Sequence, residues 1–305
     1  NNRPLGRGRA YYQLAGYLMV GTAALLFGFN GNLSRFLFQD NISPVTLVEF
    51  RMLIGALCLL AVLLLNRRKA LHIARRDWPW VIAFGLSLAL VTYAYFMAIK
   101  YLPIAIALVI QFSAGAWMAL GEALWRRKPP SWNVLVALAL TLGGIVLLTG
   151  LWHLSLNGLD AIGLIFAVLA LLTYIAYLQL GQRLRNVPSL TAMTYGSFVA
   201  SLFWLCIQPP WAIPASTWTP WHMFLITLVG ILGMAIPFTL DLIALQYINA
   251  TRAGIAATLE LAAASIIAYF WLGQRLDLSQ IIGCLGMVAG IMILPSEKSA
   301  APEVA

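Results

Sequence analysis

Long apolar segments are the feature that most constrains the fold of this chain. Ten of them follow one another, near residues 16–38, 45–65, 79–99, 103–124, 132–150, 160–181, 189–208, 221–245, 251–271 and 277–294. The length of each lies within the roughly 17–25 residues that a helix needs to cross a bilayer core of about 30 Å. The apolar stretches 79–124 and 221–271 are each about twice one span, so we divide each into two helices joined by a tight hairpin. The sequence predicts an all-α polytopic membrane protein with ten transmembrane helices.

The composition supports this class. Hydrophobic residues make up 62% of the chain and charged residues only 10%, whereas soluble domains have about 45–50% and about 25%. A soluble fold would have to leave most of this apolar surface in water, so a water-soluble protein is excluded.

The distribution of positive charge predicts the orientation in the membrane. With the N-terminus in the cytoplasm, fifteen of the 19 Lys and Arg residues fall in loops or tails on the cytoplasmic side. Lys100 and Arg275 fall on the other side, and Arg35 and Arg51 lie within spans near that outer face. Positive residues concentrate on the cytoplasmic side of membrane proteins, so we expect both termini to be cytoplasmic. The net charge of +9 then reflects loops that face anionic lipid, and we expect no nucleic-acid partner.

Ten helices also divide into two sets of five. An odd number of crossings inverts the second set relative to the first, which is the pseudo-symmetry of many secondary transporters. A constant shift of 146 residues pairs eight identical positions, among them Trp125 with Trp271 and Gly144 with Gly290. We therefore expect a first repeat over residues 1–150, and a second repeat with a short C-terminal tail over residues 151–305.

Three stretches resemble a known family. They are LLFGFNGNLSRFLFQDNISPVTLVEFRMLIGAL, YFMAIKYLPIAIALVIQFSAGAWMALGEAL and AIPFTLDLIALQYINATRAGIAATLELAAASIIAYFWLGQRLDLSQIIGCLGMVAGIMIL. Together they resemble the EamA-type ten-helix exporters of the drug/metabolite transporter (DMT) superfamily, in particular the threonine/homoserine and YddG-type amino acid exporters. The resemblance implies two inverted five-helix repeats and export by alternating access through a central cavity. That cavity would be lined by the first, third, fourth, sixth, eighth and ninth helices.

The chain departs from the family pattern at two prolines. The fourth and ninth helices of such exporters often carry an acid or amide near a proline. Here Gln111 and Glu260 provide the polar side chains, while Gly115 and Leu261 occupy the proline positions. The proline kinks of the family are therefore not expected, although Gly115 could weaken the fourth helix.

Glu260 is the strongest functional candidate. It lies in the run TLELAAASIIAY, roughly 13 Å along a helix from Thr251 and thus near the bilayer midplane. One helical face around it carries only Ala253, Ala256, Ala257, Ala263 and Ala264, while Ile255, Leu259, Ile266 and Phe270 lie on the other side. Acids inside membranes usually mark substrate or ion pathways, so Glu260 is a candidate for binding substrate and for proton coupling. The alternative is a protonated Glu260 that hydrogen-bonds to an adjacent helix.

Further polar and aromatic residues lie at similar depth. With Glu260, the substrate-binding candidates are Asn30, Tyr93, Gln111, Trp117, Tyr174 and Tyr177. The tyrosine pair, spaced i, i+3 on one helical face, could equally be packing, and Asn30 could bridge helices. A zwitterionic amino acid could use the neutral donors and the single acid. No Lys or Arg is expected near the midplane to hold a phosphate.

Four charged residues are gate candidates. Arg35, Glu49 and Arg51 fall near the outer face, as either a surface ion-pair cluster or an outer gate. Asp241 follows Pro237 toward the cytoplasmic end of its helix and could cap the helix or gate that side. Pro237 is the best candidate for a bend within a span.

The sequence favours no enzymatic class. No nucleophile with its base, paired catalytic carboxylates or phosphate-binding loop is present, and Cys58, Cys206 and Cys284 lie in separate spans. We expect neither a cofactor nor a metal. The favoured function is a secondary transporter of the bacterial inner membrane that exports small metabolites, foremost amino acids. An exporter of organic cations, drugs or other metabolites is the alternative, and a passive channel or a membrane enzyme is less favoured.

Overall fold

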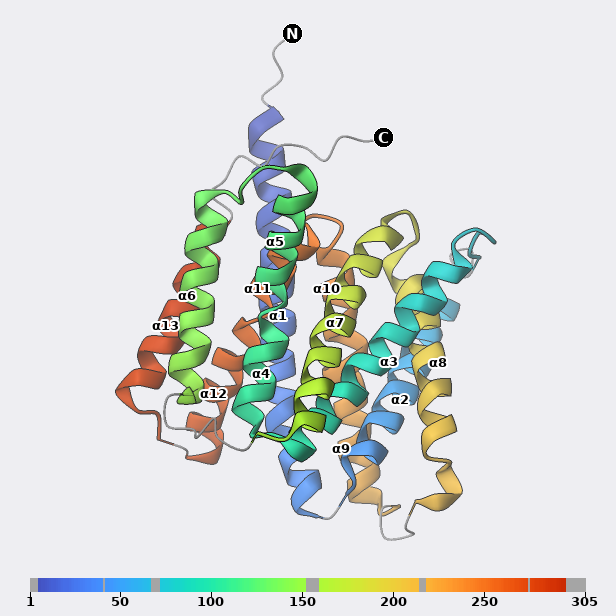
Figure 1. Ribbon diagram of the computed structural model, residues 1–305. Helices are drawn as coiled ribbons and strands as arrows, with labels where there is room; N and C mark the ends of the chain where they lie inside the picture. The colour runs from blue at the N-terminus through green and yellow to red at the C-terminus, as the bar shows by residue number, and fades with distance from the viewer. Residues whose placement is uncertain are drawn as a thin grey trace.

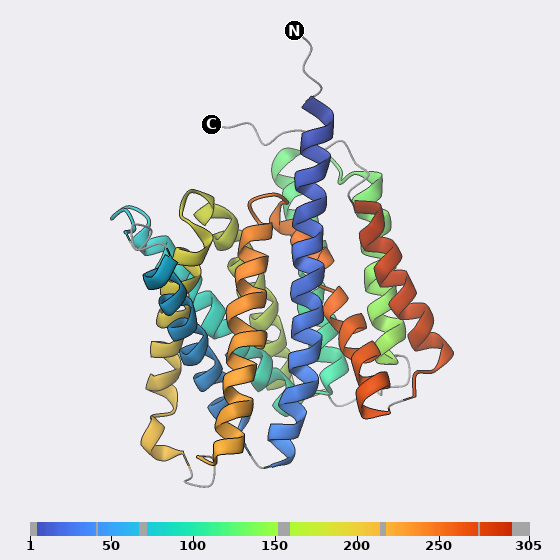
Figure 2. The same cartoon turned by 180° about the vertical axis from the view of Figure 1, so that it is seen from behind.

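The computed structural model describes residues 5–40, 42–66, 72–151, 159–213, 218–273 and 275–294. Over these residues the regular structure is entirely helical, without strands. The helices run side by side as a bundle (Figure 1). The first helix begins, and the last helix ends, at the same end of this bundle (Figure 2). We call this the termini end and the opposite one the far end.

Thirteen α-helices are described, and three pairs of them are halves of one crossing. The single helices are α1 (Leu5–Gln39), α2 (Pro44–Asn66), α3 (Trp78–Tyr101), α6 (Trp132–Thr149), α7 (Ala161–Arg183), α8 (Ser189–Ile207) and α13 (Leu278–Ile293). The pairs are α4 (Ile104–Phe112) with α5 (Ala114–Arg126), α9 (Pro220–Gly230) with α10 (Ile236–Ala244), and α11 (Ala250–Ala256) with α12 (Leu259–Leu272).

The predicted ten-helix membrane class is confirmed. Within the described residues, nine segments are long and apolar enough to cross a membrane, and α13 is a shorter apolar helix. The helix bounds follow local signals in the sequence. Side chains of Ser131, Asp160, Thr219, Asn249 and Asp277 accept hydrogen bonds from the first free N–H groups of α6, α7, α9, α11 and α13. Such caps satisfy backbone donors that the helix itself leaves unpaired.

The pairing of the helices has the symmetry of two inverted five-helix repeats. α6 packs on α13, α2 on α8 and α5 on α11, while α3 on α7 is matched by α10 on α1. If each of the first five crossings is exchanged with the corresponding one of the last five, the first three contacts stay the same. The contact of α3 with α7 becomes the contact of α10 with α1. We propose the boundary between the repeats in the connection from α6 to α7, part of which, residues 152–158, lies outside the described residues.

Two crossings are interrupted at hydroxyl residues, although the expected prolines are absent. Ser113 separates α4 from α5, and its Oγ donates to the Ile110 carbonyl at 2.6 Å. Thr258 lies between α11 and α12, and its Oγ1 donates to the Ile255 carbonyl at 2.8 Å. The Thr258 backbone N–H also bonds to this carbonyl, at 3.2 Å. Such i→i−3 bonds tighten the turn and compete with the α-helical ladder, so a bend forms without proline.

The two interrupted crossings touch each other through glycines. A Cβ atom on Gly115 of α5 would lie 2.7 Å from Cγ1 of Ile255 on α11, and one on Gly254 would lie 2.6 Å from Cε of Met118. At Gly115 the added atom would also lie 3.1 Å from the backbone nitrogen of Ile255, so a larger residue there would push the two helices apart. The Met118 methyl near Gly254 is the flexible end of a side chain. Gly115, at a proline position of the family pattern, therefore acts here in helix packing.

The eighth crossing contains a π-helical turn, Ile231–Ala235, between α9 and α10. Pro237 lies just after it and has no N–H to donate to the carbonyl of Gly233, and a proline ring clashes with the carbonyl four residues earlier. An extra residue in the preceding turn avoids that clash, as in other π-bulges. The predicted irregularity at Pro237 thus takes the form of a π-turn.

Arg185 ties two connections together at the termini end. It lies just after α7, where its Nε donates to the Leu245 carbonyl at 2.7 Å and its Nη2 to the Ile248 carbonyl at 3.1 Å. Both carbonyls belong to the connection between α10 and α11. In addition, the Ala250 N–H donates to Oε1 of Gln182 at 2.7 Å.

We expect Arg185→Gln to lower the melting temperature in detergent by about 4 °C. The variant loses charge-assisted hydrogen bonds, which contribute about 2 kcal/mol, and that corresponds to a few degrees in a chain of this size. Thermal unfolding monitored by size-exclusion chromatography measures the change. Arg183→Gln is the matched control, because Arg183 is exposed and rests on the ring of Trp80 at 4.5 Å. Equal melting temperatures for the two variants would contradict the prediction.

Candidate functional site

Glu260 lies in the first turn of α12, directly after the break that separates it from α11. Its side chain is half-buried. Among the described residues, its carboxylate has neither a hydrogen bond nor an ion pair. The hydrogen bond to an adjacent helix that would make Glu260 a packing residue is therefore not formed, and the acid is free to meet a ligand or a proton.

The small face of α12 lies against α1. A Cβ atom on Gly28 would be 2.6 Å from the backbone nitrogen of Ala264, and Asn32 Nδ2 donates to the carbonyls of Ala264 and Gly28, each at 2.9 Å. On the other side, Ile266 is 43% and Phe270 81% exposed. The sequence predicted a face of small residues and a bulky face. On the bulky side, Ile266 and Phe270 are exposed, whereas Ile255 is buried against Gly115. Asn32 joins the two helices.

Two charged groups on other helices are electrostatically coupled to Glu260. Arg51 of α2 and Asp241 of α10 both interact with it electrostatically. Tyr174 of α7 interacts with both acids, and Tyr177 with Asp241. We call these five residues the ionic centre. It unites three predicted substrate-binding residues with two predicted gate residues, which were not expected to lie together.

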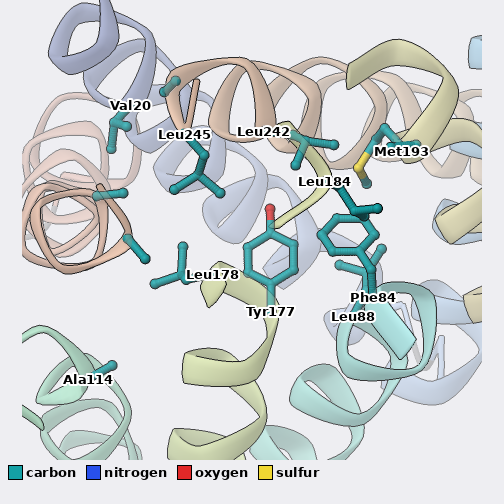
Figure 3. Packing of buried hydrophobic residues seen from close by; sticks show 14 of the residues in the cluster. Val20, Phe84, Leu88, Ala114, Tyr177, Leu178, Leu184, Met193, Leu242 and Leu245 are labelled. Carbon is teal, nitrogen blue, oxygen red and sulfur yellow. The ribbon is translucent and has the colours of Figure 1, made fainter. Parts of the chain in front are cut away.

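The tyrosines of the ionic centre sit among aromatic rings. Tyr177 stacks on Phe84, with ring centroids 5.3 Å apart, and meets Phe238 edge-on at 5.8 Å. Its hydroxyl is buried without a hydrogen-bond partner and points toward the helix that carries Leu242 (Figure 3). Tyr174 meets Phe112 edge-on at 6.3 Å. The phenylalanines were not singled out in the sequence, since apolar aromatic residues occur in every span.

Glu49 and Arg51 face different sides of α2. Residues i and i+2 of a helix do not face each other, and no ion pair joins the two within the described part of the chain. Glu49 is fully buried, and neither carboxylate oxygen has a partner. Nε of Arg51 is also buried and unpartnered. Of the ion-pair cluster considered from the sequence, Glu49 and Arg51 do not pair with each other, and the side chain of Arg35 lies outside the described residues. Arg51 instead supplies a cation that interacts with Glu260, where none was expected.

Glu49 lies on the α2 face that packs against α8. Thr46, one turn earlier, accepts a hydrogen bond from Nε2 of Gln208 at the end of α8, at 2.7 Å. Trp204, one turn before Gln208, is fully buried and its Nε1 has no partner. Sequence reasoning missed this tryptophan. Nothing in the sequence distinguishes Trp204 from the other tryptophans of the chain, which has 11 in total.

The remaining predicted residues divide into two groups. Asn30 packs its amide against Gly233 of the π-turn, and Gln111 lies in the last turn of α4; an amide oxygen of each is buried and unpartnered. Tyr93 instead packs against Phe166 and Trp204, and Trp117 is 55% exposed. Among the described residues, neither Tyr93 nor Trp117 forms a ring contact or ion pair with the ionic centre, although Tyr93 packs against the same hydrophobic cluster as Tyr177. The side chain of Arg35 lies outside the described part of the structure.

Ten crossings, three of them interrupted, around a half-buried group of opposite charges define a polytopic membrane transporter. The chain belongs to the EamA-like transporter family, which matches residues 14–150 and 161–295. The resemblance noted in the sequence is therefore confirmed.

Individual relatives agree with this family. The threonine/homoserine exporter RhtA of Escherichia coli (strain K12) is 26% identical over 283 residues, covering 90% of this chain and 88% of RhtA. The uncharacterized transporter YwfM of Bacillus subtilis (strain 168) is 25% identical over 295 residues, 94% of each chain. A solved structure described as "Crystal structure of protein" has a TM-score of 0.74 at 19% identity and covers 91% of this chain and 96% of its own. It shows the same fold. The relatives point to a transporter and away from an enzyme.

Proposed function

We propose that this protein exports amino acids across the bacterial inner membrane, by alternating access to a central site built around the ionic centre. The observation that carries the proposal is Glu260, a half-buried acid at a helix break that forms no ion pair among the described residues and interacts electrostatically with Arg51. The similarity to RhtA, a threonine/homoserine exporter, supports amino acids as the substrate class.

Each part of the site has a role in this proposal. When its carboxylate is charged, Glu260 binds the ammonium group of the substrate. Glu260 also takes up and releases a proton, and Asp241 is the second acid of the site. Asn30 and Gln111 offer amide groups that are still unsatisfied. The rings of Tyr174, Tyr177 and Phe112 provide a surface against which an apolar side chain can pack. Arg35 and Glu49 remain candidates for an outer gate.

An exporter of organic cations is the second candidate, because two acids beside tyrosine rings would also suit a lipophilic cation. A dianionic phosphate is disfavoured, because the ionic centre has two carboxylates and only one guanidinium. Transport experiments therefore have to decide whether amino acids or organic cations are the substrates.

We expect unlabelled amino acids to exchange with labelled threonine, methionine or phenylalanine preloaded in proteoliposomes. Flux should saturate and show trans-stimulation, which separates a carrier from a passive channel. Liposomes without protein are the control. Failure of every amino acid to drive exchange, together with competition by organic cations, would overturn the amino acid assignment.

We further expect both termini to be cytoplasmic. Exposed basic residues gather at the termini end, such as Arg76, Arg126 and Lys128. Lys100, in the last turn of α3, and Arg275, between α12 and α13, lie at the far end. A single cysteine introduced at His72 should be labelled by an impermeant reagent only from the cytoplasm, and one introduced at Arg275 only from outside. Both are placed in a background with Cys58, Cys206 and Cys284 replaced by alanine. Labelling in the opposite sense would contradict the orientation.

A further inference from the structure

We propose that Arg51 binds the carboxylate of the substrate while Glu260 binds its ammonium group, so that the site selects zwitterionic α-amino acids over amines and over carboxylic acids. The inference rests on the proposed amino acid export and names the groups that give it specificity. It assigns a substrate-binding role to a residue that the sequence placed at an outer gate.

The charge of Arg51 is not neutralised by its nearest acid in the sequence. Glu49 faces α8 on the other side of α2, and no carboxylate among the described residues forms an ion pair with Arg51. Its Nε is buried without a hydrogen-bond acceptor. A buried hydrogen-bond donor without an acceptor is unfavourable, so an anionic group that reaches this nitrogen gains a strong interaction.

Arg51 and Glu260 attract each other without forming a contact. Their electrostatic interaction is mutual, yet the two side chains do not come within the 4.0 Å of an ion pair. A zwitterion carries both complementary charges within a few ångströms. It can bridge the pair with a charge-assisted hydrogen bond of about 2.8 Å at each end, and the planar guanidinium can hold a carboxylate through two parallel hydrogen bonds.

The backbone near Arg51 is held at an interrupted helix. A Cβ atom on Gly230, at the start of the π-turn, would lie 2.8 Å from Cγ2 of Ile54 and 3.5 Å from the Arg51 carbonyl oxygen. α2 thus packs closely at the start of the π-turn, while Asn30 of α1 packs against Gly233 within it. Glu260 lies in the first turn of α12, just after the break at Thr258. The proposed subsite therefore has one group directly after a helix break and the other on a continuous helix that packs against a second break, and transporters commonly bind substrate at such discontinuities.

The charges of the ionic centre discriminate against substrates with one charge. An amine without a carboxylate would satisfy Glu260 but leave Arg51 unpaired. A carboxylic acid without an ammonium group would reach Arg51 but meet the negative field of Glu260 and of Asp241, which interacts with Glu260. Only a molecule with both groups satisfies both side chains.

The first test uses the unaltered protein. Proteoliposomes are loaded with the labelled amino acid that the protein exchanges fastest, and three competitors are compared: the unlabelled amino acid, its amide and its deaminated acid. We expect the amide and the acid to compete about 30-fold more weakly, since each leaves one charged side chain unpaired. Competition by the amide as strong as by the amino acid would overturn the proposal.

The second test removes the guanidinium. Arg51→Gln should raise the KM for the amino acid about 30-fold and leave competition by the amide unchanged, whereas Arg51→Lys should restore part of the preference. Arg126→Gln, the same change at an exposed arginine that pairs with Glu122, should behave like the unaltered protein. If Arg51→Gln keeps the preference for the amino acid over its amide, the proposal fails.

The outcomes separate this inference from the proposed function. Absence of amino acid exchange in the unaltered protein defeats the amino acid export itself. Exchange that occurs but does not depend on the carboxylate defeats only the role of Arg51. If Arg51→Gln does not fold, the role of Arg51 is decided by the first test alone, in which the amide and the deaminated acid compete for the unaltered protein.

Discussion

Replacing Glu260 by glutamine is expected to reduce amino acid exchange by about 100-fold while leaving the amount of folded protein unchanged. Truncating one member of a buried charged interaction costs about 3 kcal/mol, and each 1.4 kcal/mol corresponds to tenfold. Glutamine retains the size of the side chain and its hydrogen-bonding capacity. The carboxylate makes no hydrogen bond to any residue in the described part of the chain, so replacing it there breaks no hydrogen bond that holds the helices together.

The same variant should also flatten the pH profile of transport, because glutamine cannot take up or release a proton. Asp241, Arg51 and Tyr174 interact electrostatically with this position, so Asp241→Asn tests whether any remaining pH dependence belongs to the second acid. Glu122→Gln is the matched control, since Glu122 lies near the end of α5 in an ion pair with Arg126 at 3.2 Å. Normal transport with an unchanged pH profile in Glu260→Gln would exclude a functional role for the acid.

Replacing Gly28 by valine is expected to abolish transport by separating α1 from α12. Even the first added carbon would lie 2.6 Å from the Ala264 nitrogen and 3.0 Å from the Ala263 carbonyl carbon. These are backbone atoms that cannot rotate away, so the helices must move apart. Overpacking of this kind costs about 3 kcal/mol, and here it also displaces the helix that carries Glu260 and breaks the Asn32 hydrogen bond to Ala264.

Gly31→Val provides the control on the same helix. No atom lies within 4 Å of a Cβ at Gly31, so the substitution adds the same side chain without a clash. Monodisperse protein after detergent extraction and amino acid exchange are measured for both variants. If Gly28→Val were as stable and active as Gly31→Val, the close packing of α1 on α12 would not be required.

The sequence by itself determined where the chain crosses the membrane. The length and hydropathy of a segment are local properties, so spans such as 132–150 and 251–271 lie within a few residues of the helices that form. The small-residue face around Glu260 and the irregularity at Pro237 could also be predicted, because helical periodicity and the missing N–H of proline depend only on neighbouring residues. The identity of the strongest candidate acid came from the same local information.

Only the tertiary structure decided which side chains meet. Depth along one helix does not specify rotation about its axis or the helices packed against it, so Arg51 and Asp241 could not be assigned to the surroundings of Glu260, nor Glu49 to the interface with α8. The same ambiguity put Trp117 among the candidates although it is exposed. The bends at Ser113 and Thr258 were missed for a different reason: hydroxyl groups bond back to the helix carbonyls only where the packing of the helix favours the bend, and that packing is not encoded by any single segment.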